Sequence, residues 1–312
     1  MKSTAFEAAQ NFLGLIRFSH TVFALPFAAA TLVLALKHPM PNAEIAGELL
    51  RLTIPMGFGL LLCMVSARSA AMAINRLADH RFDAANPRTA DRHLPAGVMS
   101  RRSVWIMTLV CVILFFIGCA MFLPNWLPLA AAVPVLLWLG AYSFAKRFTN
   151  WPHVWLGVAL ALSPICVWAA VRGPRSLDPI SDYALPMTVA AMVAFWVSGF
   201  DILYSCQDAA FDRQAGLFSV PQRFGISRAL AIAKAFHFAM VPLLILVGWL
   251  GGDAGLHWVY WIASIVIAGM VIYQHALVRA EDLSRAGVAF FHTNAVISLT
   301  FLTAVFLDCI WL

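Results

Sequence analysis

Nine apolar runs divide this chain almost from one end to the other, and they constrain its fold more than any other feature. They lie at about residues 12–36, 53–75, 103–123, 127–145, 153–171, 184–206, 228–250, 257–277 and 289–311. A helix of about 20 apolar residues crosses the hydrocarbon core of a bilayer. We therefore predict an all-α polytopic membrane protein with nine transmembrane helices in contact with lipid.

The composition supports this prediction and excludes the main alternatives. Only 12% of the residues are charged, whereas soluble domains carry about 25%, so a soluble globule would lack polar residues for its surface. The six cysteines show no CxxC spacing, and nearly all lie in apolar runs, which is typical of small buried side chains. Because no loop is long enough for a soluble domain, we expect one integral-membrane domain over residues 1–312.

Positive charges are distributed unevenly between the two sides of the predicted bundle. If the N-terminus shares a side with the loops after every second helix, that side carries 15 of the 21 Lys and Arg residues and the other side four. Cytoplasmic loops are enriched in Lys and Arg, so we predict a cytoplasmic N-terminus in a bacterial inner (plasma) membrane. This basic face explains the net charge of +6 without a nucleic-acid partner. Arg17 and His20 interrupt the first run, which we expect to remain as a helix rather than to be cleaved as a signal peptide.

Two segments carry polar side chains at the same spacing, each at the end of an apolar run. The first consists of Asn75, Asp79 and Asp83, and the second of Tyr204, Asp208 and Asp212. Residues four apart lie on one face of a helix, and the two sets follow predicted helices that are four apart in the chain. We therefore predict a pseudo-repeat of four-helix units, with cytoplasmic cap segments at about residues 76–102 and 207–227.

Carboxylates spaced in this way need a positive partner. Like charges one helical turn apart destabilise a helix by about 0.2–0.5 kcal/mol per pair, and desolvation near a bilayer adds to this cost. Mg²⁺ typically binds one or two carboxylates and leaves its other positions to water and phosphate oxygens. Nearby arginines complement a polyanion; they are Arg76, Arg81, Arg88, Arg92, Arg213 and Arg223. Together these residues indicate a diphosphate site, and the alternative is two solvated helix ends with weak ion pairs.

A third basic junction follows the fourth predicted helix. It reads Tyr142-Ser-Phe-Ala-Lys146-Arg147. Lys146 and Arg147 are candidates to contact phosphate, and Tyr142 lies one helical turn before Lys146. The alternative is that these two charges only set the membrane topology.

At these motifs the chain resembles the UbiA superfamily of intramembrane aromatic prenyltransferases. The matching motifs are NxxxDxxxD (75–83), NPRT followed by LPAG (86–97), YSxxKR (142–147), DxxYxxxDxxxD (201–212) and SxPxRFG (219–225). They occur in order, and the resemblance covers essentially the whole chain. It implies a nine-helix barrel around a central cavity, with cytosolic caps.

The resemblance also implies an activity and a set of site residues. Two Mg²⁺ ions, as cofactor, would hold the diphosphate of a polyprenyl donor, whose allylic carbon is then attacked by an aromatic acceptor. The implied metal ligands are Asp79, Asp83, Asp208 and Asp212, of which Asp79 and Asp208 also count as catalytic. The implied diphosphate-binding residues are Asn75, Arg88, Tyr142, Lys146 and Arg147, with Tyr204 as a further substrate-binding candidate. Asp201 matches a position near the acceptor and is a candidate catalytic residue.

The acceptor is predicted from the first apolar run. Arg17 and His20 are candidates to hold an anionic ring substituent such as a carboxylate, although Arg17 could instead be a topogenic or snorkelling charge. The stretch SHTVFALPF (19–27) is similar to the branch of 4-hydroxybenzoate polyprenyltransferases, but an Asp-Lys-Pro-Ile-Gly segment common in well-studied members is absent. We expect 4-hydroxybenzoate as acceptor, in quinone biosynthesis. The alternative is a dihydroxynaphthoate-type acid in menaquinone biosynthesis by the futalosine route.

A secondary transporter is the alternative from another functional class. Internal repeats and intramembrane ionisable residues also mark transporters. Their sites lie near the bilayer midplane, however, whereas the aspartates of this chain cluster at predicted cytoplasmic helix ends. No feature of the sequence indicates an obligate protein partner.

Overall fold

The computed structural model describes residues 11–15, 25–40 and 52–311, and every regular element within these ranges is helical. The long helices are α2 (Leu25–Lys37), α3 (Ile54–Ala85), α4 (Arg101–Ala120), α5 (Leu127–Ala141), α6 (Pro152–Arg172), α7 (Ala184–Ser205), α10 (Ile226–Leu250), α11 (Trp258–Ala276) and α12 (Ala286–Phe306). Two short helices, α8 (Ala209–Gln214) and α9 (Val220–Phe224), connect α7 to α10. Tighter 3₁₀ turns cover Tyr142–Arg147, Gly173–Leu177, Ile180–Tyr183, Cys206–Asp208 and Gly252–Ala254, and a π-helical turn covers Leu307–Trp311.

The predicted fold class, an all-α polytopic membrane protein, is confirmed. Eight helical segments are long and apolar enough to cross a membrane, and α2 is a shorter apolar helix. The eight long segments coincide with the second to ninth predicted runs, whereas α2 covers the part of the first run that the structure describes. The main difference is in α3, which continues past the predicted end at residue 75 to Ala85. The whole first acidic segment therefore lies on one long helix.

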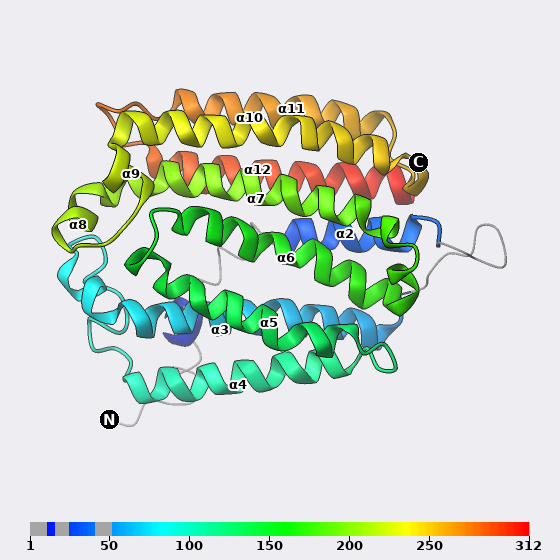
Figure 1. The fold of residues 1–312 in the computed structure, drawn as a ribbon, viewed down its shortest axis with the longest axis horizontal. Coiled ribbons are helices and arrows are strands. Elements are labelled where there is room, and N and C mark those ends of the chain that lie inside the picture. The colour runs from blue at the N-terminus through cyan, green and yellow to red at the C-terminus, as the bar shows by residue number, and fades with distance from the viewer. Residues whose placement is uncertain (1–10, 16–24, 41–51, 312) are drawn as a thin grey trace.

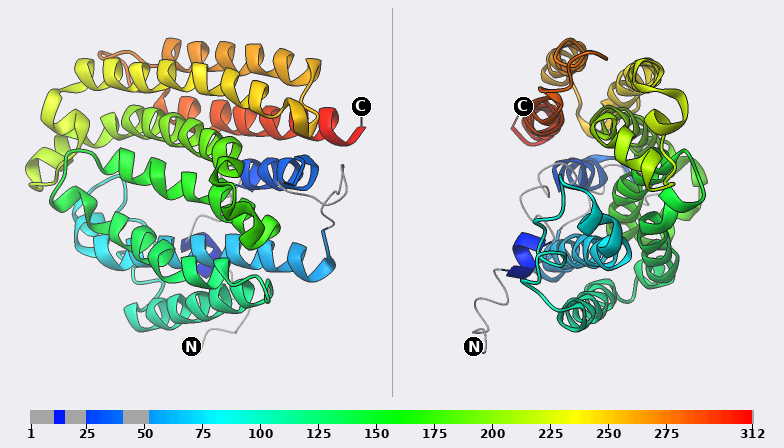
Figure 2. Two further views of the ribbon diagram at one scale, coloured as in Figure 1. Left: turned by 45° about the vertical axis from the view of Figure 1, so that its right-hand side comes forward. Right: turned by 90° about the vertical axis from the view of Figure 1, so that its left-hand side faces the viewer.

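The helices lie side by side with roughly parallel axes, as the end-on view of Figure 2 shows. The most extensive contacts join α6 to α7, α7 to α10, α3 to α4 and α11 to α12. α2 contacts both α6 and α12. In the described part of the chain, α2 near the beginning therefore packs against α12 near the end.

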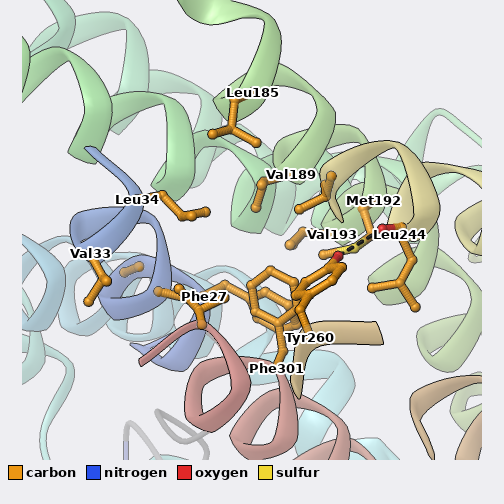
Figure 3. Packing of buried hydrophobic residues seen from close by; sticks show 14 of the residues in the cluster. Phe27, Val33, Leu34, Leu185, Val189, Met192, Val193, Leu244, Tyr260 and Phe301 are labelled. Carbon is orange, nitrogen blue, oxygen red and sulfur yellow. Dashed lines mark hydrogen bonds between the residues drawn. The ribbon is translucent and has the colours of Figure 1, made fainter. Parts of the chain in front are cut away.

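The largest hydrophobic core lies among α2, α6, α7, α10, α11 and α12. The ring of Phe27 lies 5.0 Å from the rings of both Trp196 and Phe301, measured between centroids. The buried hydroxyl of Tyr260 donates a hydrogen bond to the carbonyl of Leu244 at 2.7 Å (Figure 3), as a buried phenol requires. This core fixes α7, the helix that begins the second acidic segment.

α6 and α7 approach each other closely at Gly157. A Cβ atom at this position would lie 2.4 Å from Ser198 Oγ and 2.5 Å from the carbonyl oxygen of Ala194, so only a residue without a side chain fits. His153 lies one turn before Gly157 on α6. The close approach brings this histidine beside Asp201 on α7, with Nδ1 2.7 Å from Asp201 Oδ2.

The connections at 86–100, 142–151 and 206–225 lie at the same end of the bundle, where Figure 1 shows α8 and α9. We call this the cap end, and the right view of Figure 2 looks onto it. The two predicted cap segments therefore lie on one side of the molecule. This arrangement brings residues far apart in the chain to a common region.

A buried ion pair lies at the end of the bundle opposite the cap end. Arg172, in the last turn of α6, donates hydrogen bonds to both carboxylate oxygens of Asp182 at 2.8 and 2.6 Å. It also donates to the carbonyls of Ala35 and His38, at the C-terminal end of α2, at 3.1 and 2.9 Å. Trp168 donates to the same carboxylate at 2.8 Å. Every group of this buried pair is thus partnered, and the pair joins α6 to α2.

Candidate active site

Both acidic segments line one cavity at the cap end of the bundle. The cavity has a volume of about 280 Å³ and is lined by side chains of α3, α6, α7, α8, α12 and the connections between helices. The predicted site residues that line it are Asn75, Asp79, Asp83, Arg88, Tyr142, Lys146, Asp201, Tyr204, Asp208 and Asp212. Arg147 is not among the lining residues, and Arg17 and His20 lie outside the described part of the chain.

The first acidic segment follows the predicted geometry. Asn75, Asp79 and Asp83 lie on successive turns of the uninterrupted helix α3. The amide of Asn75 donates a hydrogen bond to Asp79 Oδ2 at 2.9 Å. Buried Asp83 is paired with Arg92 at 2.6 Å and lies 3.5 Å from Arg76. Within this segment Asp79 therefore has a neutral hydrogen-bond donor, whereas Asp83 has two cationic partners.

The second acidic segment departs from the predicted regular helix. α7 ends at Ser205, a 3₁₀ turn covers Cys206–Asp208, and Asp212 lies on the separate short helix α8. A 3₁₀ turn has three residues per turn instead of 3.6, so the side chains rotate relative to an α-helical face. Asp208 and Asp212 nevertheless line the same cavity as Asp201 and Tyr204.

Arg88 connects the first cap to the second acidic segment. Its Nε donates to Asp208 Oδ1 at 2.8 Å, and its Nη2 pairs with the other oxygen of the same carboxylate. Its Nη1 donates to the hydroxyl of Tyr204 at 2.9 Å. Burial is the largest single influence and opposes the charge of the guanidinium, but the hydrogen bonds and charge interactions with Asp208 and Tyr204 together outweigh it and raise the pKa of Arg88 above its usual value. Arg88 therefore remains a permanent cation at the cavity.

The basic junction after α5 contacts both acidic segments. Lys146 Nζ lies 3.1 Å from both carboxylate oxygens of buried Asp212. Arg147 lies 3.6 Å from Asp79 and donates a hydrogen bond to the carbonyl of Ala78 at 2.7 Å. Arg147 thus contacts the outer side of the first acidic segment rather than the cavity.

The six arginines that lie near the acidic segments in the sequence divide into two groups in the structure. Arg76, Arg88 and Arg92 line the cavity. The other three are exposed and do not line it: Arg81, Arg213 and Arg223. Arg81 lies on α3, Arg213 on α8 and Arg223 on α9, and the sequence did not indicate that these helices expose the three side chains.

The donor set suits Mg²⁺ bound together with a diphosphate. Among the described residues, no group of three or more acidic, histidine or cysteine side chains forms a ready metal cage. The four carboxylates of the two acidic segments nevertheless line one cavity. Asp83 Oδ2 is buried and makes no hydrogen bond in the described part, although Arg76 lies 3.5 Å away. Mg²⁺ needs only one or two carboxylates when phosphate and water supply the rest, so these residues fit it.

Two cavity residues were not assigned a role from the sequence. Arg68 lines the cavity from α3, and in the described part of the chain it has no ion pair or side-chain hydrogen bond. Its position two helical turns before Asn75 places it on the same face of α3 as the acidic segment, and this spacing could have identified it. His153 had no comparable signal, because its partner Asp201 is distant in sequence.

Comparison with known proteins gives a consistent picture. The profile of the UbiA prenyltransferase family matches residues 24–296. A 4-hydroxybenzoate octaprenyltransferase of Cupriavidus pinatubonensis is 32% identical over 232 residues, which cover 73% of this chain and 75% of that protein. The range matched by the family profile includes both acidic segments.

Two solved structures share the fold. An apo structure of a UbiA homologue from Aeropyrum pernix K1 superposes with a TM-score of 0.80 at 29% identity, covering 93% of this chain and 98% of that one. A UbiA homologue from Archaeoglobus fulgidus bound to GPP and Mg²⁺ superposes with a TM-score of 0.67 at 20% identity, covering 96% and 99%. The helical arrangement of Figure 1 is therefore also found in experimental structures.

Proposed function

Because this chain belongs to the UbiA prenyltransferase family, we propose that it transfers a polyprenyl group from polyprenyl diphosphate to 4-hydroxybenzoate, with Mg²⁺ as cofactor. The observation that carries the proposal is that two acidic segments and their cationic partners line one cavity in a membrane-embedded helix bundle. The named relative from Cupriavidus supports the acceptor. Membership of a transferase family removes the transporter alternative.

The donor diphosphate would occupy the cap end of the cavity. Asp79, Asp83, Asp208 and Asp212 would hold Mg²⁺, which supplies charge neutralisation of the diphosphate when it is bound. Arg88 and Lys146 currently pair with the second acidic segment. Once metal balances these carboxylates, both cations become available to bind diphosphate oxygens, and they stabilise the negative charge that grows as the leaving group departs.

The allylic carbon would lie against an aromatic wall. Tyr204 stacks on Phe290 with ring centroids 4.3 Å apart, and Phe200 contacts Phe290 edge to face at 5.4 Å. All three line the cavity. Aromatic faces attract cations, so this wall stabilises positive charge on the prenyl chain while excluding water from it.

The acceptor carboxylate would bind Arg68. A cation in a membrane-embedded cavity is costly without a partner, and in the described part of the chain Arg68 has none. An aromatic acid supplies the missing carboxylate through a charge-assisted hydrogen bond. This argument applies equally to the alternative dihydroxynaphthoate-type acceptor, and the named relatives favour 4-hydroxybenzoate.

Asp201 would remove the ring proton. Transfer forms a bond between a ring carbon and C1 of the prenyl chain, while the bond from C1 to the diphosphate oxygen breaks with its electron pair. The ring carbon then loses its proton to the Asp201 carboxylate, and the C–H electron pair returns to the ring. Asp201 lines the cavity and keeps part of its side chain exposed there, as a general base requires.

One assay tests the proposed function. Membranes containing the chain are incubated with Mg²⁺, labelled polyprenyl diphosphate and a panel of aromatic acids, and the products are identified by mass. We expect one prenyl group added to 4-hydroxybenzoate, with loss of product when EDTA removes the metal. Product only from a dihydroxynaphthoate-type acid would replace the acceptor, and no product from any acid would contradict the proposal.

The site is proposed to face the cytoplasm of a bacterial inner membrane. The excess of Lys and Arg residues on the predicted N-terminal side supports this orientation. The cap end contains loops that carry this excess of Lys and Arg residues. The diphosphate site would therefore open towards the water-soluble pool of Mg²⁺.

A further inference from the structure

His153 is the most completely buried ionisable side chain that lines the cavity. It is the second residue of α6, its exposed fraction is 0%, and it lies against α7 and the cap. A buried polar ring costs free energy unless its nitrogens are hydrogen-bonded. The partners of these two nitrogens therefore indicate what the residue does.

The partners fix the tautomer of His153. The backbone N–H of Val220 can only donate, and it lies 3.4 Å from Nε2. Nε2 must then be the acceptor, so the proton is on Nδ1 and is donated to Asp201 Oδ2 at 2.7 Å. Ser205 Oγ also lies 3.5 Å from Nε2, but a proton on Nε2 alone would leave lone pairs facing each other across the 2.7 Å contact between Nδ1 and Asp201 Oδ2. The neutral ring thus links three elements: α6, α7 and the start of α9.

The hydrogen bond from His153 leaves the other carboxylate oxygen of Asp201 available to accept a proton. His153 is the one hydrogen-bond donor to this carboxylate in the described part of the chain, and it contacts Oδ2 alone. About 19% of the Asp201 side chain is exposed, and the residue lines the cavity. Holding one oxygen fixes the rotation of the carboxylate and directs the lone pairs of the other, in the way that outer partners orient functional groups.

We propose that His153 is a positioning residue for Asp201: it holds the carboxylate in the orientation that accepts the ring proton and anchors it to the cap at Val220. This inference rests on the proposed function, in which Asp201 is the base. His153 contacts no reacting atom. Its effect is therefore expected on the rate of transfer and not on binding of the donor.

Two polar substitutions of His153 distinguish its role in positioning Asp201 from the effect of burying a polar side chain. In His153→Asn the amide nitrogen takes the place of Nδ1 and can still donate to Asp201. In His153→Gln the amide reaches the place of Nε2, next to Val220, and leaves Asp201 without its donor. Both variants bury one amide group, so a purely structural role would affect them similarly.

The test measures kcat and the KM of each substrate for the full chain in membranes. We expect His153→Gln to lower kcat by roughly 10- to 100-fold, with an unchanged KM for polyprenyl diphosphate, and His153→Asn to remain close to wild type. Combining His153→Gln with Asp201→Asn should lower kcat no further than Asp201→Asn alone, because the histidine acts through the aspartate.

Each contrary result has a defined meaning. If wild type transfers prenyl groups and both His153 variants are as active as wild type, the positioning role is wrong although the proposed function holds. Equal losses in both variants, or effects that multiply in the double variant, would also overturn it. Absence of transfer by wild type itself would overturn the proposed function and the inference with it. If His153→Gln does not accumulate, loss of activity in a folded His153→Asn variant would overturn the proposal.

Discussion

At the scale of single residues, the site consists of carboxylates that are already balanced by cations from other elements. Asp208 pairs with Arg88, Asp212 with Lys146, and Asp83 with Arg92. Bound Mg²⁺ would replace these partners rather than fill an isolated acidic cluster. The same cations are then available for the diphosphate, so metal and donor binding should be coupled.

The aspartates of the two segments should each be indispensable for turnover. We expect Asp79→Ala and Asp208→Ala to lower kcat by at least about 100-fold, the usual effect of losing a group that stabilises developing charge. Arg213→Ala is the matched control, because Arg213 is exposed and does not line the cavity. The measurement is prenyl transfer per folded protein in the membrane. Full activity of either aspartate variant would contradict the metal assignment.

Arg68 should determine affinity for the acceptor. Arg68→Met removes the cation, and we expect the KM of the aromatic acid to rise roughly 10- to 100-fold, the value of a hydrogen bond to a charged group. Arg68→Lys keeps the charge and should lose less. Steady-state kinetics with each substrate varied in turn would show this. An equal rise in the KM of the donor would place Arg68 at the diphosphate instead.

The sequence predicts the aspartates of the two acidic segments better than it predicts Arg68 and His153. Asp79 and Asp208 stand out because two matched spacings occur in one chain. Arg68 lies in an apolar run, and its spacing from Asn75 could have indicated its face of α3. Only the structure shows that it lines the cavity without an acidic partner in the described part of the chain. His153 is recognised only through Asp201, which lies on another helix, so no local pattern could have identified it.

At the scale of helices, the site depends on how closely α6 and α7 approach. Gly157→Ala would place a methyl group against Ser198 and the backbone of Ala194. We expect a loss of about 1–3 kcal/mol in stability from overpacking, and lower turnover because His153 moves away from Asp201. Gly269→Ala on α11 is the control, since no atom lies within 4 Å of its added Cβ. Thermal unfolding in detergent and prenyl transfer would both report the effect, and an unchanged Gly157→Ala variant would contradict it.

The buried pair at the opposite end should support stability without touching the chemistry. Arg172→Met leaves Asp182 buried without its cation, and breaking such a pair typically costs about 3–5 kcal/mol. Arg175→Met, three residues further on in the next 3₁₀ turn and exposed, should be nearly neutral. We expect a lower midpoint of thermal unfolding for Arg172→Met and nearly normal turnover at low temperature. A midpoint equal to that of Arg175→Met would show that the pair does not stabilise the fold.

Helix positions were predictable, but helix irregularities were not. The apolar runs predicted eight of the described long segments because crossing a bilayer demands length and hydropathy. The 3₁₀ turns at Tyr142–Arg147 and Cys206–Asp208 had no such signal. Residues four apart have the same spacing in the sequence whether or not the helix continues, so the break after Ser205 depends on packing against the caps.

At the scale of the whole molecule, the fold unites two distant parts of the chain at one end of the bundle. α3 brings the first acidic segment and α7 begins the second, and the connections of the cap end place Arg88 and Lys146 between them. The predicted pseudo-repeat and the single domain remain predictions. The membrane class followed from the apolar runs and the composition, whereas the shared cavity required the tertiary structure.

The central claim is that both acidic segments hold one metal-bound diphosphate. The most direct test is a structure of the purified chain with Mn²⁺ and a non-hydrolysable polyprenyl diphosphate analogue, with the metal located by its anomalous scattering. We predict metal between the diphosphate and carboxylates of both segments, at Asp79 or Asp83 and at Asp208 or Asp212. Metal and diphosphate bound by one segment alone, or outside this cavity, would contradict the account.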